Sequence, residues 1–252
     1  MGGPSRPIPD PVIDPVERLS AARVAVRSRI DAACERVGRD PAGVQLVAIS
    51  KTVPLQVLSN APAAGLHALG ENRVQEAADK VSSLPHVEWH LVGHLQGNKA
   101  AKALDLFSVI ESVDSVELAA RLSRLAGERG RERMPVYLQV NVDIDPAKAG
   151  FAPDALESAV APVLALPALE VCGLMTVGML VHAPEQARST FVRLRTLSET
   201  LRGRYAGLGP GLSMGMSDDF EVAVEEGSTL VRVGRAIFGE RPPMGDRPPV
   251  VG

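Results

Sequence analysis

The sequence predicts an α/β protein, a single (β/α)8 barrel of the TIM type with an extra helix before the first strand. Eight short apolar runs alternate with stretches of helical periodicity over roughly 200 residues, as eight βα units require. The length of 252 residues is ordinary for one such barrel. An open doubly wound sheet is the alternative, and no G-x-G-x-x-G or P-loop motif favours either fold.

The extra helix is expected to begin after Asp14. Asp14 can cap the helix, Pro15 suits its first turn, and Glu17 stands three residues after the cap. Gly38 is a suitable C-terminal stop. Between these signals, apolar residues recur at helical spacing at Leu19, Ala22, Val26, Ile30, Ala33 and Val37.

The apolar runs and the periodic stretches between them define the expected barrel elements. Strands are expected at 44–50, 66–69, 88–93, 107–111, 135–141, 169–175, 211–214 and 229–233. Helices are expected at 54–64, 72–83, 97–105, 115–130, 153–164, 184–203 and 218–226. Pro-rich segments at 1–13 and 241–252 are expected to be disordered, so the barrel domain should comprise residues 14–240.

The composition is that of an ordinary folded protein. Apolar residues make up 45% of the chain and charged residues 23%, and the net charge of −3 is too small to indicate a nucleic-acid or membrane partner. No run of about 18 apolar residues occurs, and the first residues lack the apolar core of a secretory signal. Cys34 and Cys172 occur in apolar patterns, which predicts two buried free thiols and no metal site. We therefore expect a cytoplasmic monomer.

Small and polar residues gather after the seventh and eighth expected strands. In a (β/α)8 barrel ligands bind at the carboxyl ends of the strands, and these two loops commonly hold a phosphate. Backbone N–H groups of such loops can cradle an anion. Each residue alone is also compatible with an ordinary turn, so the prediction depends on their joint occurrence. The expected anion-binding residues are Ser213, Gly215, Ser217, Gly234 and Arg235.

Lys51 stands directly after the first expected strand, in the run LVAISKT. A lysine at the end of a buried strand loses hydration, which favours its neutral amine. A neutral amine can attack an aldehyde and form an imine. A structural ion pair at the barrel mouth is the alternative. Together with a phosphate cradle, an imine-forming lysine suits either pyridoxal 5′-phosphate (PLP) or the sugar phosphate of a Schiff-base aldolase.

Arg232 favours PLP over the sugar phosphate. In LVRVG the alternation directs Val231 and Val233 to one side and Arg232 to the other, which is the lumen in a barrel strand. PLP sites place a charged residue, Asp or Arg, against the pyridine nitrogen. An arginine retains its proton, so that nitrogen stays unprotonated and the ring is a weaker electron sink. A surface arginine is the alternative.

Six motifs in order resemble the PLP homeostasis protein family (the YggS/PROSC group), which is related to the N-terminal barrel of alanine racemases. The motifs are AISKT, GENRVQE, EWHLVGHLQGNK, VNVDIDPAKAGF, GLMTVG and LSMGMSDDFEVAVEEGSTLVRVGRAIFG, and they extend from 44 to 240. The resemblance implies PLP held as an aldimine of Lys51, with Arg232 facing the pyridine nitrogen. It assigns the phosphate to Ser213, Ser217, Gly234 and Arg235, and it puts Asn72, His94 and Met175 near the ring or the mouth. Relatives often have Thr or Ser in place of Arg235.

The resemblance also implies a binding protein without catalytic residues, which takes part in PLP homeostasis by buffering PLP or by delivering it to apo-enzymes, its expected transient partners. Alanine racemases need a second base, a tyrosine supplied by a further domain, and only a short tail follows the eighth expected strand. The tyrosines of this sequence, Tyr137 and Tyr205, fall in a strand and after a helix. Loss of one proton-transfer group typically costs about 10²–10⁴-fold in rate. The alternatives are a PLP-dependent amino-acid racemase of low activity and a PLP-free Schiff-base lyase.

Overall fold

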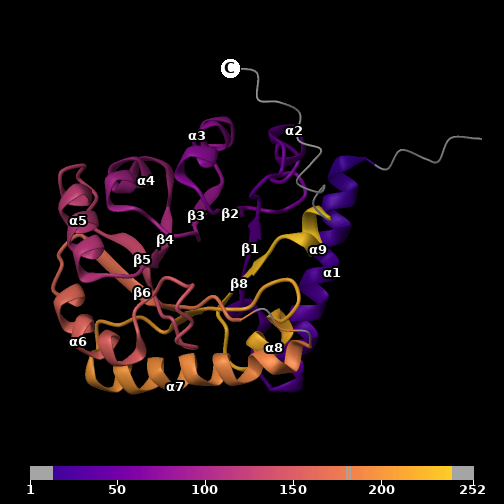
Figure 1. The fold of residues 1–252 in the computed structure, drawn as a ribbon. Helices are drawn as coiled ribbons and strands as arrows, with labels where there is room; N and C mark the ends of the chain where they lie inside the picture. The colour runs from indigo at the N-terminus through magenta and orange to yellow at the C-terminus, as the bar shows by residue number, and fades with distance from the viewer. Residues whose placement is uncertain (1–13, 180, 182, 240–252) are drawn as a thin grey trace, which may run out of the picture.

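The computed structural model of the chain describes residues 14–179, 181 and 183–239. Its eight strands are parallel and close into a barrel in the order β1-β2-β3-β4-β5-β6-β7-β8, with helices around the outside (Figure 1). The predicted (β/α)8 architecture is therefore confirmed. The two terminal segments predicted to be disordered, and residue 240 of the predicted barrel domain, lie outside the described residues.

Each expected strand is present, with bounds that differ by at most a few residues. The strands are β1 (Gln45–Ile49), β2 (Ala68–Glu71), β3 (Glu88–Leu91), β4 (Val109–Val113), β5 (Met134–Gln139), β6 (Leu169–Met175), β7 (Gly211–Ser213) and β8 (Leu230–Val233). The α-helices are α1 (Pro15–Arg36), α2 (Leu55–Leu58), α3 (Val74–Ser83), α4 (Ala100–Leu106), α5 (Val116–Gly127), α6 (Pro153–Leu164), α7 (Arg188–Arg204), α8 (Phe220–Glu225) and α9 (Arg235–Phe238). Three 3-10 turns are η1 (Pro41–Gly43), η2 (Gly97–Lys99) and η3 (Pro184–Ala187).

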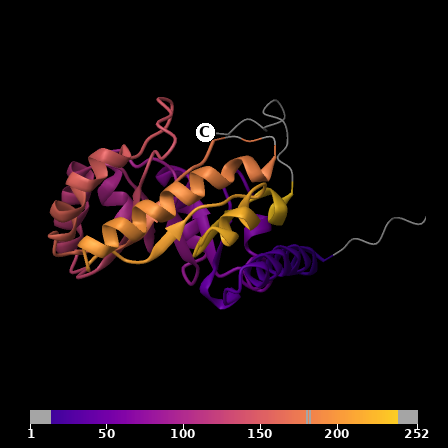
Figure 2. The same ribbon diagram turned by 90° about the horizontal axis from the view of Figure 1, so that it is seen from below.

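The extra N-terminal helix α1 begins as predicted and packs beside α8 and α9 (Figure 1). Asp14 Oδ1 accepts a hydrogen bond of 3.0 Å from the backbone N–H of Val16. Farther along, Arg29 forms an ion pair of 3.0 Å with Glu221 of α8, while Arg36 forms one of 2.6 Å with Glu225. In Figure 2 the orange helix α7 crosses the middle of the view, and the indigo helix α1 lies below it at the right.

The second expected helix, 54–64, is wrong in extent. Only α2 is helical there, and the chain continues through turns in which the N–H of Ala61 bonds to the carbonyl of Leu58. The reason is Pro62, because a proline disfavours helical geometry in the residue before it. The strand that follows, β2, accordingly begins at Ala68 rather than at residue 66. The four-residue helix α9 was not expected.

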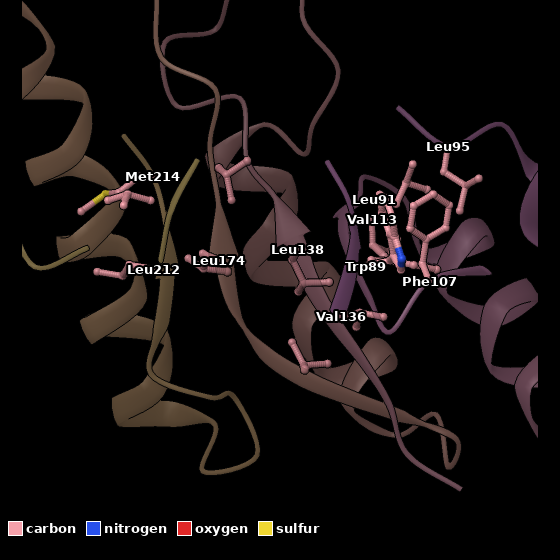
Figure 3. Packing of buried hydrophobic residues seen from close by; sticks show 14 of the residues in the cluster. Trp89, Leu91, Leu95, Phe107, Val113, Val136, Leu138, Leu174, Leu212 and Met214 are labelled. Atoms are coloured by element: carbon pink, nitrogen blue, oxygen red, sulfur yellow. The ribbon is translucent and has the colours of Figure 1, made fainter. Parts of the chain in front are cut away.

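Side chains of the strands alternate between the helical layer and the lumen. Trp89 and Leu91 of β3 point outward and pack with Leu95, Phe107 and Val113, as Figure 3 shows. Trp89 is 1% exposed, because it packs between the barrel and the helices. A separate apolar group fills part of the lumen, from Val47, Ile49, Ala68, Tyr137 and Leu230.

The two cysteines are free thiols, as predicted. Cys34 is buried in α1, but Cys172 is only partly buried because it lines a cavity at the amino-terminal face of the barrel, beside Tyr137 and Gly211. Burial raises the pKa of the Cys172 thiol to about 11. Separately, no helix in the described part of the chain is long and apolar enough to cross a membrane.

Candidate cofactor-binding site

Lys51 lies where β1 ends at the mouth of the barrel. β1 pairs with β8 on one side and with β2 on the other, so the lysine stands between the ends of these two strands. Its side chain is half-buried. The next residue, Thr52, has a φ of +66°, which is rare for a β-branched residue. The chain therefore turns sharply directly after the lysine.

The residue before Lys51 is held by a buried polar network. Ser50 Oγ donates a hydrogen bond of 2.6 Å to Glu71 Oε1. Lys80 of α3 donates to the same oxygen over 2.7 Å and to the carbonyl oxygen of Ser50 over 2.9 Å. Glu71 is fully buried, and its other carboxylate oxygen has no hydrogen-bond partner among the described residues. These contacts fix the backbone from which Lys51 projects.

Arg232 lies inside the barrel on β8, as the alternation predicts. It is 4% exposed, while Val231 and Val233 on either side are buried in the outer core. Its guanidinium donates a hydrogen bond of 2.6 Å to the carbonyl oxygen of Thr176 and another to Ser213 Oγ. Burial lowers the pKa of Arg232 from its ordinary value, and the nearby carboxylates of Glu111 and Asp219 oppose this shift.

A carboxylate and an imidazole continue this arrangement across the lumen. Glu111 Oε2 accepts a hydrogen bond of 2.5 Å from Ser213 Oγ, and Glu111 Oε1 lies 2.7 Å from His90 Nδ1. The other ring nitrogen of His90 lies 2.9 Å from Glu88 Oε1. Burial by itself lowers the pKa of His90, but its hydrogen bonds to Glu111 and Glu88 raise it to about 9. A carboxylate oxygen lies beside each ring nitrogen, an arrangement that favours the protonated imidazole.

The loops that follow β7 and β8 meet above Arg232. The backbone N–H of Gly234 donates a hydrogen bond of 3.3 Å to Ser217 Oγ, and the N–H of Arg232 donates one of 3.0 Å to the carbonyl of Gly215. Gly215 has a φ of +95°, and a Cβ there would lie 2.6 Å from the Cβ of Ala223. Only glycine lets the β7 loop pack this closely against α8.

Arg235 opens α9 and pairs with Asp218 of the facing loop. Both side chains are exposed, so this ion pair closes the outer edge of the two loops without being buried. The neighbouring Asp219 is 4% exposed, and its Oδ1 accepts a hydrogen bond of 2.6 Å from the N–H of Met216. The two aspartates therefore have different surroundings at the start of α8.

Asn72 and His94 lie together at the mouth, after β2 and β3, and line a cavity of about 400 Å³. A Cβ at Gly93 would come within 2.3 Å of the Asn72 carbonyl oxygen, so the two loops are in close contact. His94 Nδ1 lies 2.9 Å from Asp114 Oδ2. These residues stand on the opposite side of Lys51 from the β7 and β8 loops.

Ser213 and Met175 lie deeper in the barrel than the loop residues. They are register partners at the ends of β7 and β6, and both are fully buried. The structure brings the Ser213 hydroxyl to Arg232 and Glu111, whereas Ser217 contacts Gly234. The assignment of Ser213 to a phosphate stays a prediction.

Three adjacent strands, β7, β8 and β1, bring Lys51, Arg232 and the predicted phosphate-binding loops to one side of the mouth. A Cβ at Gly234 would lie 3.3 Å from the carbonyl oxygen of Ile49, two residues before Lys51. Arg232 lies on β8, which ends one residue before Gly234. The strands that carry Lys51, the Ser217–Gly234 contact and the buried Arg232 guanidinium are thus neighbours in the barrel. This donor set fits a small ring that carries an aldehyde, a phosphate and a hydrogen-bond acceptor.

The sequence prediction missed Glu111 and His90 as members of this arrangement. The available signal was the alternation in EWHL, where Glu88 and His90 share one face of a strand whose other face is apolar. In a closed barrel the polar face of a buried strand can only point into the lumen.

Comparisons with known proteins show the family and the fold. Residues 23–242 match the family described as alanine racemase, N-terminal domain. The pyridoxal phosphate homeostasis protein of Aquifex aeolicus is 41% identical over 227 residues, which are 89% of this chain and 97% of that protein. The structure of PipY of Synechococcus elongatus with PLP bound has a TM-score of 0.77 at 39% identity and covers 88% of this chain and 100% of its own. An alanine racemase of Clostridium difficile shares the fold, with a TM-score of 0.70 at 12% identity over 90% of this chain and 57% of the racemase.

Proposed function

This chain belongs to the family of pyridoxal phosphate homeostasis proteins, and we propose that it binds PLP through Lys51 and takes part in PLP homeostasis without catalysing a reaction on amino acids. The observation that carries this proposal is the convergence of Lys51, the Ser217–Gly234 contact and Arg232 on three adjacent strands. The relative PipY, whose structure contains PLP, supports the same ligand.

The phosphate of PLP would be held by the loops after β7 and β8. The Ser217 hydroxyl and the backbone N–H of Gly234 already lie 3.3 Å apart, so both can donate to one anion. Gly215 permits the close packing that brings the β7 loop to this place. Arg235, beside Gly234, carries a guanidinium at the edge of the loops, where it pairs with Asp218. These residues favour a ligand with a doubly charged phosphate over the free vitamin.

The pyridine end would face Arg232. A guanidinium that keeps its proton donates a hydrogen bond to the ring nitrogen and leaves that nitrogen unprotonated. Met175, which is fully buried at the end of β6, would supply apolar contact beneath the ring. Asn72 and His94 would border the ring from the other side of Lys51. An unprotonated ring withdraws electrons weakly, which disfavours chemistry on a bound amino acid.

When bound, PLP supplies an aldehyde that condenses reversibly with primary amines. The amine of this chain that would hold it is Lys51, because Ser50 and Lys80 fix the backbone beside it and Thr52 turns the chain away. Since this bond exchanges with other amines, the same chemistry would allow release to the lysine of an apo-enzyme. We include this delivery in the proposal.

The positions of the tyrosines support a role without catalysis. A racemase places a second base, a tyrosine, on the other face of the ring. The chain has two tyrosines. Tyr137 lines the cavity at the amino-terminal face, and Tyr205 follows the last residue of α7, which ends at that same face. Neither lies at the mouth with Lys51. Proton-transfer groups in such sites contribute about 10²–10⁴-fold, so a racemase lacking one would be slow.

The test is reduction of the PLP-loaded protein with borohydride, followed by peptide mass spectrometry. We expect a visible absorbance band that disappears on reduction and a pyridoxyl group on Lys51. Lys51→Ala should keep the fold and lose the band. A pyridoxyl group at another lysine, or none, would contradict the binding proposal. Incubation with L- and D-alanine in deuterated water tests the absence of catalysis, because exchange at Cα at enzymatic rates would identify a racemase instead.

A further inference from the structure

A row of hydrogen-bonded polar side chains crosses the barrel interior and ends at Arg232. Glu88 bonds to His90 over 2.9 Å and His90 bonds to Glu111 over 2.7 Å. The second oxygen of Glu111 accepts from Ser213 over 2.5 Å, and Ser213 accepts from Arg232. We call these five residues the lumen row. They come from β3, β4, β7 and β8, so the row connects strands on opposite sides of the barrel.

The lumen row is removed from water along most of its length. His90 is 1% exposed, Glu111 is fully buried, and only the side chain of Glu88 is open, at 47%. Buried charges are costly unless they are paired. Glu88, His90, Glu111 and Arg232 alternate in sign when all are ionised, so their formal charges sum to zero. The pKa of His90, raised to about 9 by the two carboxylates, is consistent with that state.

Glu111 is the member of the row that acts on Arg232. Its Oε2 lies 3.8 Å from Arg232 Nη1, and Ser213 bridges the two groups. The other terminal nitrogen of the guanidinium is occupied by the carbonyl of Thr176. Both terminal nitrogens of the guanidinium therefore have fixed hydrogen-bond partners. The negative charge that opposes the guanidinium is that of Glu111, on the Ser213 side. Without Glu111, His90 and Arg232 would be two buried cations with no carboxylate between them.

Stability alone does not account for such a row. Replacing buried ionic groups with apolar residues of similar volume is often neutral or stabilising, so a barrel could fill this space with aliphatic side chains. The neighbouring part of the lumen does so, with Val47, Ile49 and Leu230. The polar row instead leads to the one side chain that we assign to the pyridine nitrogen. Departures from the apolar rule of this kind are expected at functional sites.

We propose that Glu111 and His90 are positioning residues for the pyridine end of bound PLP: they hold the Arg232 guanidinium in one orientation and balance its charge, so that it donates to an unprotonated ring nitrogen. This inference rests on the proposed function. Neither residue touches the ligand, so their effect passes through Arg232 and Ser213. His90 keeps Glu111 ionised, and Glu111 keeps Arg232 aligned.

The first experiment compares PLP spectra and affinities of Glu111→Gln and Ser213→Ala with those of the wild type. We expect the visible band to shift in both variants and the dissociation constant of PLP to rise by about tenfold in Glu111→Gln, since directly coupled buried groups interact at this level. The double variant His90→Gln, Glu111→Gln removes one charge of each sign and should recover part of that loss. Glu226→Gln, whose carboxylate pairs with Arg188 and Arg195 outside the barrel, is the matched control and should leave both readouts unchanged.

A second measurement needs no ligand and no variant. Nitrogen-15 NMR of the apoprotein should show both ring nitrogens of His90 protonated at pH 7. A neutral ring would overturn the inference, as would unchanged spectra and affinities in both Glu111→Gln and Ser213→Ala. If Glu111→Gln does not fold, Ser213→Ala and the NMR measurement decide, because Ser213→Ala leaves no charge unpaired.

Borohydride labelling of Lys51 tests the proposed function separately from this inference. A wild type that forms no adduct at Lys51 disproves the proposed function and the inference with it. A wild type that forms the adduct, with variants that match it in spectrum and affinity, disproves the inference alone.

Discussion

Lys80 Nζ lies 2.9 Å from the carbonyl oxygen of Ser50, the residue that precedes Lys51. The same ammonium lies 2.7 Å from the fully buried carboxylate of Glu71. A helix of the outer layer therefore holds the end of β1 where the strand delivers its amine to the mouth. The packing of α3 and the position of the candidate imine-forming lysine are linked by this one contact.

Lys80→Met should destabilise the protein by about 3 kcal/mol, because removing one partner of a buried ion pair leaves the other charge without compensation. Glu71 would keep only its hydrogen bond to Ser50. Urea unfolding monitored by Trp89 fluorescence measures the loss. The double variant Glu71→Leu, Lys80→Met removes both charges and should recover most of it. If Lys80→Met were as stable as the wild type, the ion pair between Glu71 and Lys80 would contribute nothing to the free energy of unfolding.

The positions of the strands could be predicted because each is a short apolar run between turn residues, and eight such runs leave few folds open. The orientation of Arg232 could also be predicted, since alternation in LVRVG is a local property of one strand. The predicted extent of the second helix, 54–64, was wrong because the helical spacing of apolar residues was given more weight than Pro62.

The lumen row could not be predicted, because its contacts join strands far apart in the sequence. Glu88 and His90 are two residues apart, but Ser213 lies 102 residues from Glu111, its partner. Nothing in the sequence gives the relative heights of these side chains in the barrel, which depend on the register between strands. For the same reason the sequence grouped Ser213 with Ser217, although the structure gives the two hydroxyls different partners.

Gly215→Ala should destabilise the protein by about 1–3 kcal/mol. The φ of +95° is unfavourable for alanine, and the new Cβ would lie 2.6 Å from the Cβ of Ala223 and 2.9 Å from the Cα of Phe220. Since the displaced loop carries Ser217, affinity for PLP should fall as well. Gly203→Ala in α7 is the control: a Cβ there meets nothing within 4 Å, so stability should stay the same or rise slightly. Thermal unfolding of both variants and titration with PLP provide the measurements, and equal behaviour of the two would contradict the packing argument.

Ser217→Ala should weaken binding of PLP by about tenfold, because hydrogen bonds to charged groups contribute about 1.5–3 kcal/mol. Binding of pyridoxal, which lacks the phosphate, should not change. Competition between the two ligands, followed by absorbance, measures this selectivity. Ser83→Ala, which removes an exposed hydroxyl of α3, should behave as the wild type. A loss that is equal for PLP and pyridoxal would place Ser217 away from the phosphate.

His90 should make the stability of the protein depend on pH between about 6.5 and 9. Its pKa is about 9 in the folded protein and 6.5 in the unfolded chain, so the folded state binds the proton more tightly. The stabilisation is fully present below pH 6.5 and is lost as the pH rises through 9, because the unfolded chain releases this proton first. The carboxylates of Glu88 and Glu111 have lowered pKa values and act on the acid side instead, where stability falls as they become protonated. Urea unfolding at intervals from pH 6 to 9.5 should therefore show a decline that is smaller in His90→Gln. The cysteine thiols titrate in both the wild type and His90→Gln, so the difference between the two stability curves isolates the contribution of His90. Parallel curves would mean that the imidazole is neutral in the folded barrel.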